Sequence, residues 1–133
     1  MSDFVFVIMS KELMNEIFSL DPGIRYAAVL SPRGTHLEGG MRPGIASVNP
    51  ESEEDKLFLQ ATVARGMSES WSKFFGSFKF SFFIYERLNV IQLTFGENVL
   101  LVTTEPGIPI SLAQSMVEVL QKHKGTGPQK DLR

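Results

Sequence analysis

The sequence contains no cysteine and only two histidines, and these absences exclude several kinds of chemistry. Without cysteine there is no disulfide framework, no thiolate zinc or iron–sulfur ligation and no cysteine nucleophile. His36 and His123 lie far apart and form no HxxxH or HxH spacing, so a histidine-based metal centre is not expected. We therefore predict a protein without a metal or cofactor, and the lack of cysteine fits a cytoplasmic location.

An excess of one charge and a long apolar run are also missing. The 13 basic and 15 acidic side chains give a net charge of −2, so no overall positive field attracts a nucleic acid. The apolar run at residues 4–9 is too short to cross a bilayer. Asp3 stands where a signal peptide would carry basic residues. Nucleic acid binding, a membrane span and export are therefore not expected.

Signatures of catalysis are absent as well. There is no G-x-S-x-G elbow, and the acidic run at residues 51–55 lacks the spacing of an EF-hand. The segment 39–44 joins glycines to an arginine but matches neither a P-loop nor G-x-G-x-x-G. It is either a turn that glycine permits or a contact for a partner or anion through Gly40 and Arg42. We predict a protein that is not an enzyme.

The size and composition are those of one soluble domain. The chain has 133 residues, of which 43% are hydrophobic and 21% charged. We divide it into an apolar segment at 1–9, a single domain at 10–124 and a polar, flexible tail at 125–133. The segment 4–9 fits a strand or the first turns of a helix equally well, and this choice stays open.

Turn residues and apolar spacing predict the elements of the first half of the chain. A helix is expected from Ser10 to Leu20, followed by strands at 24–30 and 35–39 that Ser31-Pro32-Arg33-Gly34 joins into a hairpin. Asn49 as N-cap and Pro50 as first residue predict a helix of about six turns that Gly76 ends. Five residues of this helix are expected to cover the sheet, namely Leu57, Ala61, Ala64, Met67 and Trp71.

The second half reads as three consecutive antiparallel strands and a helix. The strands are expected at 78–85, 90–95 and 99–104, and Phe78, Phe80, Phe82 and Ile84 should face inward. Ser111 can cap a short amphipathic helix that ends near Gly125. The order α-β-β-α-β-β-β-α predicts an α+β fold with one antiparallel five-stranded sheet and helices packed on it.

Four stretches of the sequence carry a resemblance to a known family. They are Phe18–Val29, Gly39–Gly44, the acidic start of the long helix and Leu100–Pro106. With the element order, they resemble the roadblock and dynein light chain superfamily, which is close in architecture to profilins and longin domains. They are closer still to an uncharacterised archaeal family of domains, over about residues 10–122.

The resemblance implies a sheet-centred domain that pairs with a copy of itself. The superfamily regulates small GTPases and provides scaffolds, so a small GTPase or another regulatory protein is the implied partner. The resemblance implies no catalytic residue. It leads to the prediction of a non-enzymatic, homodimerising interaction or regulatory module.

Aromatic residues are concentrated between Trp71 and Tyr85, where only Lys73 and Lys79 supply positive charge. Base-stacking surfaces interleave aromatic and basic residues more densely, so core packing and a partner interface explain this segment better. An alternative function is a small-ligand sensor, because an antiparallel sheet lined with Phe and Met can enclose an apolar ligand.

The long helix carries more apolar residues than one sheet face needs, and the strand after it has no proline or bulge to protect an edge. We therefore predict that this helix and strand form the homodimer interface. The residues expected in it are Phe58, Val63, Phe74, Phe83 and Tyr85.

Overall fold

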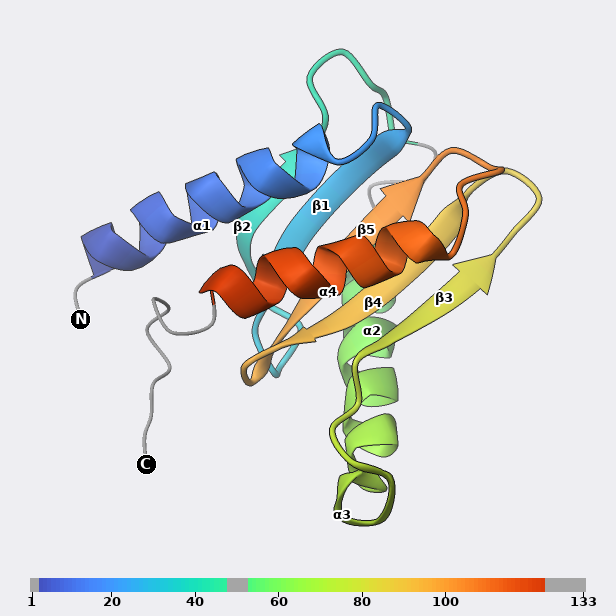
Figure 1. The fold of residues 1–133 in the computed structure, drawn as a ribbon. Coiled ribbons are helices and arrows are strands. Elements are labelled where there is room, and N and C mark those ends of the chain that lie inside the picture. The colour runs from blue at the N-terminus through green and yellow to red at the C-terminus, as the bar shows by residue number, and fades with distance from the viewer. Residues whose placement is uncertain (1–2, 48–52, 124–133) are drawn as a thin grey trace.

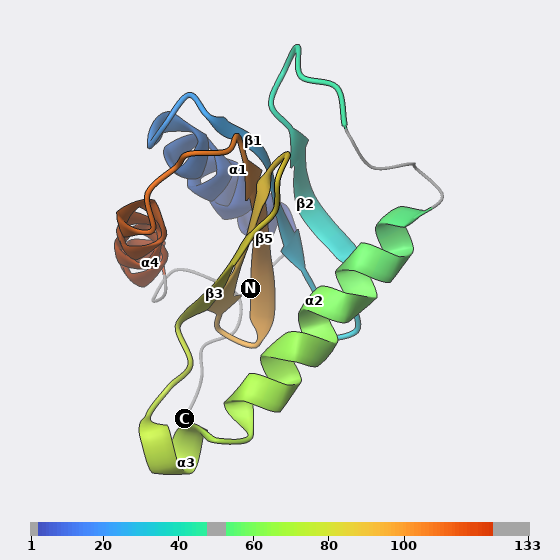
Figure 2. The same cartoon turned by 90° about the vertical axis from the view of Figure 1, so that its right-hand side faces the viewer.

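The computed structural model describes residues 3–47 and 53–123, with side chains described from residue 11 onward in the first helix. Five strands form one antiparallel sheet in the order β2-β1-β5-β4-β3. Helices α1 and α4 cover one face of this sheet and α2 lies on the other (Figures 1 and 2). This is the α+β architecture and the element order that the sequence predicts. The elements are α1 (Asp3–Ser19), β1 (Ile24–Leu30), β2 (His36–Met41), α2 (Glu54–Glu69), α3 (Ser72–Phe75), β3 (Phe80–Ile84), β4 (Asn89–Phe95), β5 (Asn98–Thr104) and α4 (Ser111–His123).

The N-terminal apolar segment is helical. Helix α1 begins at Asp3, so the strand alternative for residues 4–9 is wrong and these residues belong to the same helix as the buried Leu13 and Ile17. A strand at this place would need a sheet edge to pair with, whereas a helix satisfies its own backbone groups. The predicted tail at 125–133 lies outside the described residues.

The second strand of the β1–β2 hairpin starts one residue later than predicted and extends two residues further. The hydroxyl of Ser31 accepts hydrogen bonds from the backbone N–H groups of Arg33 and Thr35 and so fixes the turn. Strand β2 continues past Gly39 to Met41, because Gly39 lets the two strands approach closely. A Cβ at Gly39 would lie 2.1 Å from the carbonyl oxygen of Ala27, and the φ of Gly39 is +104°. The glycines thus extend the strand instead of ending it.

Two hydrophobic clusters lie on opposite faces of the sheet. The larger joins α1 and α4 to alternate residues of β1, β4 and β5, with Phe80 and Phe82 of β3 packed against it. The smaller lies under α2 and contains Tyr26, Phe58 and Ala61. Because successive strand residues point to opposite faces, the buried runs of β1, β4 and β5 supply both clusters.

The predicted single helix to residue 75 is interrupted. Helix α2 ends at Glu69 and α3 begins at Ser72. Between them, the hydroxyl of Ser70 donates a hydrogen bond to the carbonyl of Met67, and the backbone N–H of Trp71 donates to the carbonyl of Ser68. These bonds interrupt the regular helical pattern. Gly76, with a φ of +88°, ends α3 as predicted. The predicted start at Asn49 and Pro50 lies outside the described residues.

The last three strands form the predicted antiparallel meander, with β3 pairing to β4 and β4 to β5. Strand β3 is shorter than predicted, beginning at Phe80 and ending at Ile84. The prediction that Ile84 faces inward is wrong: its side chain is 79% exposed. Ile84 lies opposite Asn89, at the end of the pairing, where no helix covers the sheet.

A small charged cluster joins helices α1 and α4, and we expect it to make the stability of the fold depend on pH. The side chains of Lys122 and His123 both contact the Glu16 carboxylate. Hydrogen bonding to Lys122 first, and to His123 second, lowers the pKa of Glu16 below its ordinary value of 4.5. A lowered pKa in the folded state stabilises the fold above pH 4.5 and ceases to do so as the pH falls below that value.

Glu16→Gln should therefore reduce the urea midpoint of unfolding near neutral pH, and this deficit should shrink as the pH falls below 4.5 and the carboxylate becomes protonated. Glu12→Gln removes an exposed carboxylate from the same helix and serves as the control. A Glu16→Gln deficit that persists unchanged at acidic pH would show that the cluster does not act through the charge.

Candidate functional site

The outer face of α2 is apolar along its length. Leu59, Val63 and Met67 follow one another four residues apart, which places them on one side of a helix, and Met67 is 68% exposed. The opposite side carries the buried Phe58 and Ala61. These exposed side chains do not pack on the sheet, and an exposed apolar stripe of this kind is typical of an interaction surface.

The apolar stripe continues into an aromatic cluster on α3. Trp71 is 55% exposed and stacks on Phe75, with 5.4 Å between ring centroids and an interplanar angle of 12°. Phe74 lies 6.0 Å from Trp71 and is also exposed. Figures 1 and 2 both show that the end of α2 and α3 extend beyond the sheet, so these rings have no strand beneath them.

Strand β3 is an open sheet edge next to this surface. It pairs only with β4, so the backbone groups on its outer side have no partner strand among residues 3–47 and 53–123. Phe83 lies opposite Val90, a member of the cluster under α2, and is 41% exposed. Phe83 therefore lies on the same side of the sheet as α2. We call the exposed apolar residues of this region the α2–β3 face: Leu59, Val63, Met67, Trp71, Phe74, Phe75, Phe83 and Tyr85.

The other edge of the sheet is protected. The pairing of β1 with β2 shifts register between Val29 and Leu30, and α1 lies against β2, where Lys11 and Glu38 form an ion pair. Register shifts and inward charges are common means of blocking edge-to-edge pairing. Of the two edges, only β3 presents a regular ladder to another strand.

Arg42 has a structural role, which favours the first of the two interpretations that the sequence left open for segment 39–44, a turn, over a contact for a partner or anion. Its guanidinium donates hydrogen bonds to the carbonyls of Ile24, Phe18 and Asp21 at 2.7, 2.7 and 2.8 Å. It also lies 5.0 Å from the ring centroid of Phe18. These contacts satisfy backbone acceptors at the end of α1 and in the loop that follows. Gly40 belongs to β2, where it pairs with Ala27.

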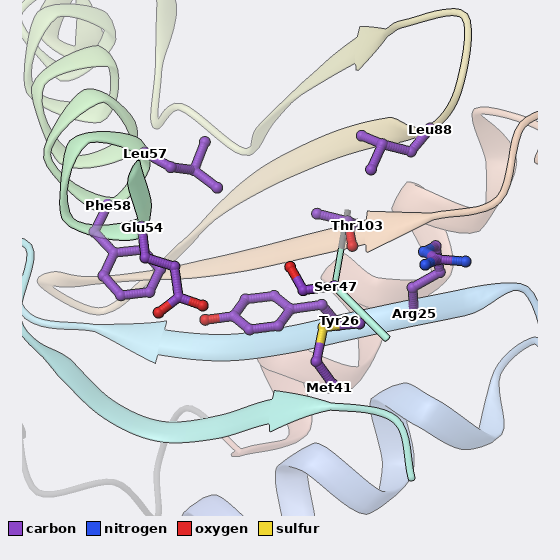
Figure 3. A pocket seen from close by; sticks show the side chains of 9 residues that line it. All are labelled: Arg25, Tyr26, Met41, Ser47, Glu54, Leu57, Phe58, Leu88 and Thr103. Carbon is purple, nitrogen blue, oxygen red and sulfur yellow. The ribbon is translucent and has the colours of Figure 1, made fainter. Parts of the chain in front are cut away.

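A small pocket lies between the start of α2 and the sheet (Figure 3). In Figure 3 the hydroxyl of Tyr26 points toward the carboxylate of Glu54, while Met41, Leu57 and Leu88 form the apolar walls. Burial, and secondly the charge of Glu54, raise the pKa of Tyr26 above its ordinary value of 10.0, so the hydroxyl stays protonated. The cavity volume of about 20 Å³ holds roughly one water molecule, which is too small for the ligand of the sensor alternative.

Within residues 3–47 and 53–123, no three His, Cys, Asp or Glu side chains gather closely enough to hold a metal ion. No helix among the same residues has the length and apolar character needed to cross a membrane.

Comparison with known proteins places the fold. No protein-family model matches the sequence, and no curated protein is significantly similar to it. Solved structures are similar: a Roadblock/LC7 domain from Streptomyces avermitilis has a TM-score of 0.63 at 17% identity, over 85% of this chain and 92% of that one. The chain has the Roadblock/LC7 fold. A structure titled MglB with tetrameric arrangement has a TM-score of 0.71 at 16% identity, over 91% of this chain and 89% of that one. The gliding protein MglB from Thermus thermophilus has a TM-score of 0.66 at 18% identity, over 87% and 88% of the two chains.

The likeness to these structures confirms the predicted fold. The resemblance to an archaeal family is not tested by these structures and stays a prediction. Within the roadblock fold, four of the five residues predicted for the dimer interface are exposed, namely Val63, Phe74, Phe83 and Tyr85. Phe58 is 5% exposed and packs under α2, so its assignment to the surface is wrong.

The sequence predicts that Met67 and Trp71 cover the sheet, but both side chains are exposed in the structure. The repeat of Leu59, Val63 and Met67 at four-residue spacing was the available signal for this. It follows a different side of the helix from the repeat of Phe58, Ala61 and Thr62. The sequence alone does not say which of the two sides meets the sheet, because both are apolar.

Proposed function

We propose that this protein is a non-enzymatic regulatory module that forms a homodimer through the α2–β3 face, and that the dimer acts on a small GTPase or another regulatory protein. The observation that carries the proposal is the open β3 edge on the same side of the molecule as the exposed apolar stripe of α2 and α3. A monomer would leave both in water.

A two-fold axis perpendicular to the sheet explains how one contact would use both features. Antiparallel pairing of β3 with its copy would satisfy the free backbone groups and join the two sheets into one. Such an axis keeps the same face of both sheets on the same side, so the two α2 helices would lie on one continuous surface. Their apolar stripes could then cover each other.

The apolar area available is of the kind that a stable dimer uses. Large exposed apolar side chains are gathered on α2, α3 and the end of β3. Stable interfaces bury at least roughly 1,000 Å² in total, and a contact between two copies would have to reach that area. Trp, Tyr, Phe and Met, which make up much of the α2–β3 face, are the residues enriched at interfaces. A similar solved structure, MglB, has a tetrameric arrangement, which supports self-association.

The regulatory role rests on the resemblance to the roadblock superfamily, and its test uses nucleotide kinetics. Small GTPases from the same organism, loaded with fluorescent GDP or GTP, would be mixed with the purified protein. We expect nucleotide release or hydrolysis by one of them to change by about tenfold or more, equal to about 1.4 kcal/mol of barrier. The control is the Phe83→Lys variant, which should fold but lose the dimer.

If no GTPase tested binds the protein or changes its rate of nucleotide release or hydrolysis, the GTPase assignment is contradicted. The homodimer is a separate claim, and mass measurements test it. An unchanged rate effect with Phe83→Lys would show that regulation does not need the dimer.

A further inference from the structure

A cavity of about 450 Å³ lies at the end of the sheet away from the small pocket. It is open to solvent on one side and is lined by the last turns of α2, the segment 77–79 before β3, the turn between β4 and β5, and α4. Its walls combine an apolar part, made of Phe78, Phe95, Val117 and Leu120, with the polar side chains of Arg65 and Thr94. Cavities of this volume and mixed character are typical of small-molecule sites.

Arg65 carries an unpaired charge at this cavity. Its Nη2 donates to the carbonyl of Gly96 at 2.8 Å, and no carboxylate in the described part of the chain lies within 4.0 Å of its guanidinium. Its Nε–H is buried without an acceptor. Thr94, which belongs to β4 and lines the cavity, also has a buried hydroxyl without a partner. Buried donors without acceptors are rare in folded proteins and indicate a missing partner.

The charge of the cavity favours an anion. Arg65 and Lys79 are positive and Glu69 is negative, so the lining carries one net positive charge. Glu69 stands four residues after Arg65 on α2 but does not pair with it. A carboxylate matches the planar donor fork of arginine and accepts from a hydroxyl as well, whereas a dianion would exceed the positive charge present.

We propose that this cavity binds a small amphipathic carboxylate, with its carboxylate at Arg65 and Thr94 and its apolar body against Phe78 and Phe95. The Nε of Arg65 and the hydroxyl of Thr94 are closed to solvent, so in this proposal both side chains must turn toward the cavity when the ligand enters. An acceptor there gives both donors the hydrogen bond that they lack. The apolar walls would cover the body of the ligand, while the open side of the cavity leaves the ion pair partly in contact with water.

The site is separate from the proposed dimer contact. Arg65 follows Val63 by two residues, which places the two side chains on opposite sides of α2. Lys79 precedes β3, whereas Phe83 and Tyr85 stand at its far end. Binding of the carboxylate and dimerisation can therefore be tested independently.

The test is a titration followed by amide chemical shifts in two-dimensional NMR, with hexanoate as the probe. Hexanol, which has a similar body without the charge, and acetate, which has the charge without the body, are the matched controls. We expect hexanoate to shift the amides around Arg65, Thr94 and Gly96 and to bind at least about tenfold more tightly than either control. Arg65→Gln should weaken hexanoate binding by about tenfold or more.

A second variant separates binding from structure. Thr94→Val removes a hydroxyl that has no partner, so it should weaken hexanoate binding while the thermal midpoint of unfolding stays equal or rises. Val63→Glu, which should dissociate the dimer, should leave hexanoate binding intact.

Three results would overturn the proposal: hexanol binding as tightly as hexanoate, unchanged hexanoate binding by folded Arg65→Gln, or no shifts at these amides up to about 10 mM hexanoate.

Discussion

Val63→Glu is expected to convert the protein from a dimer into a folded monomer. Val63 is exposed in the single chain, so a glutamate there costs little before association. In the dimer the same carboxylate would be buried against an apolar surface without a partner, and the two-fold symmetry makes the change occur twice. We expect association to weaken by about a hundredfold or more, equal to about 3 kcal/mol. Light scattering at micromolar concentration measures the mass.

Phe83→Lys tests the same interface from the strand side and should have the same effect. Gln114→Glu adds an equal charge on the exposed side of α4, on the opposite face of the sheet, and should leave the dimer unchanged. Circular dichroism verifies that each variant is folded. If the wild-type protein has the mass of a monomer, or if both folded variants remain dimers, the α2–β3 face is not the interface.

Arg42→Ala is expected to lower the free energy of unfolding by about 3 kcal/mol, because charged hydrogen bonds contribute about 1.5–3 kcal/mol each and are not additive. The change removes the donors to the carbonyls of Phe18, Asp21 and Ile24, which tie the end of α1 to the sheet. The mass in solution and any binding by the α2–β3 face should not change. Urea unfolding measures the effect.

Arg33→Ala is the matched control, since Arg33 is an exposed arginine whose backbone, not its side chain, bonds in the turn before β2. It should change stability by less than about 0.5 kcal/mol. Arg42→Lys should recover only part of the loss, because one ammonium group cannot reproduce the fork of the guanidinium. An Arg42→Ala protein as stable as the wild type would contradict the structural role.

The sheet could be predicted from the sequence because every strand is bounded by residues with strong turn chemistry. Ser31 to Gly34 and the glycine of the β4–β5 turn fix two hairpins by local geometry alone. The extension of β2 through Gly39 could not be predicted, because the reason for it is the carbonyl of Ala27 on the neighbouring strand.

The functional surface was predicted only in part, for a physical reason. Apolar periodicity identifies faces of a helix but does not say which face meets the protein's own sheet and which meets a partner. Phe58 and Met67 were therefore interchanged between core and surface. The role of Arg42 stayed open between a turn and a ligand contact, because its three acceptors come from Phe18, Asp21 and Ile24, which only folding brings to it.

The most direct test of the proposed interface is the fluorescence of Trp71, the single tryptophan of the chain. Trp71 lies within the α2–β3 face and is 55% exposed in the isolated chain. Emission and acrylamide quenching would be measured over a range of protein concentrations, in parallel with mass. The account predicts that emission shifts to shorter wavelength and quenching falls as the dimer forms, and that Phe83→Lys abolishes both changes. A wild-type dimer in which Trp71 is quenched as readily as in the monomeric variant would contradict it.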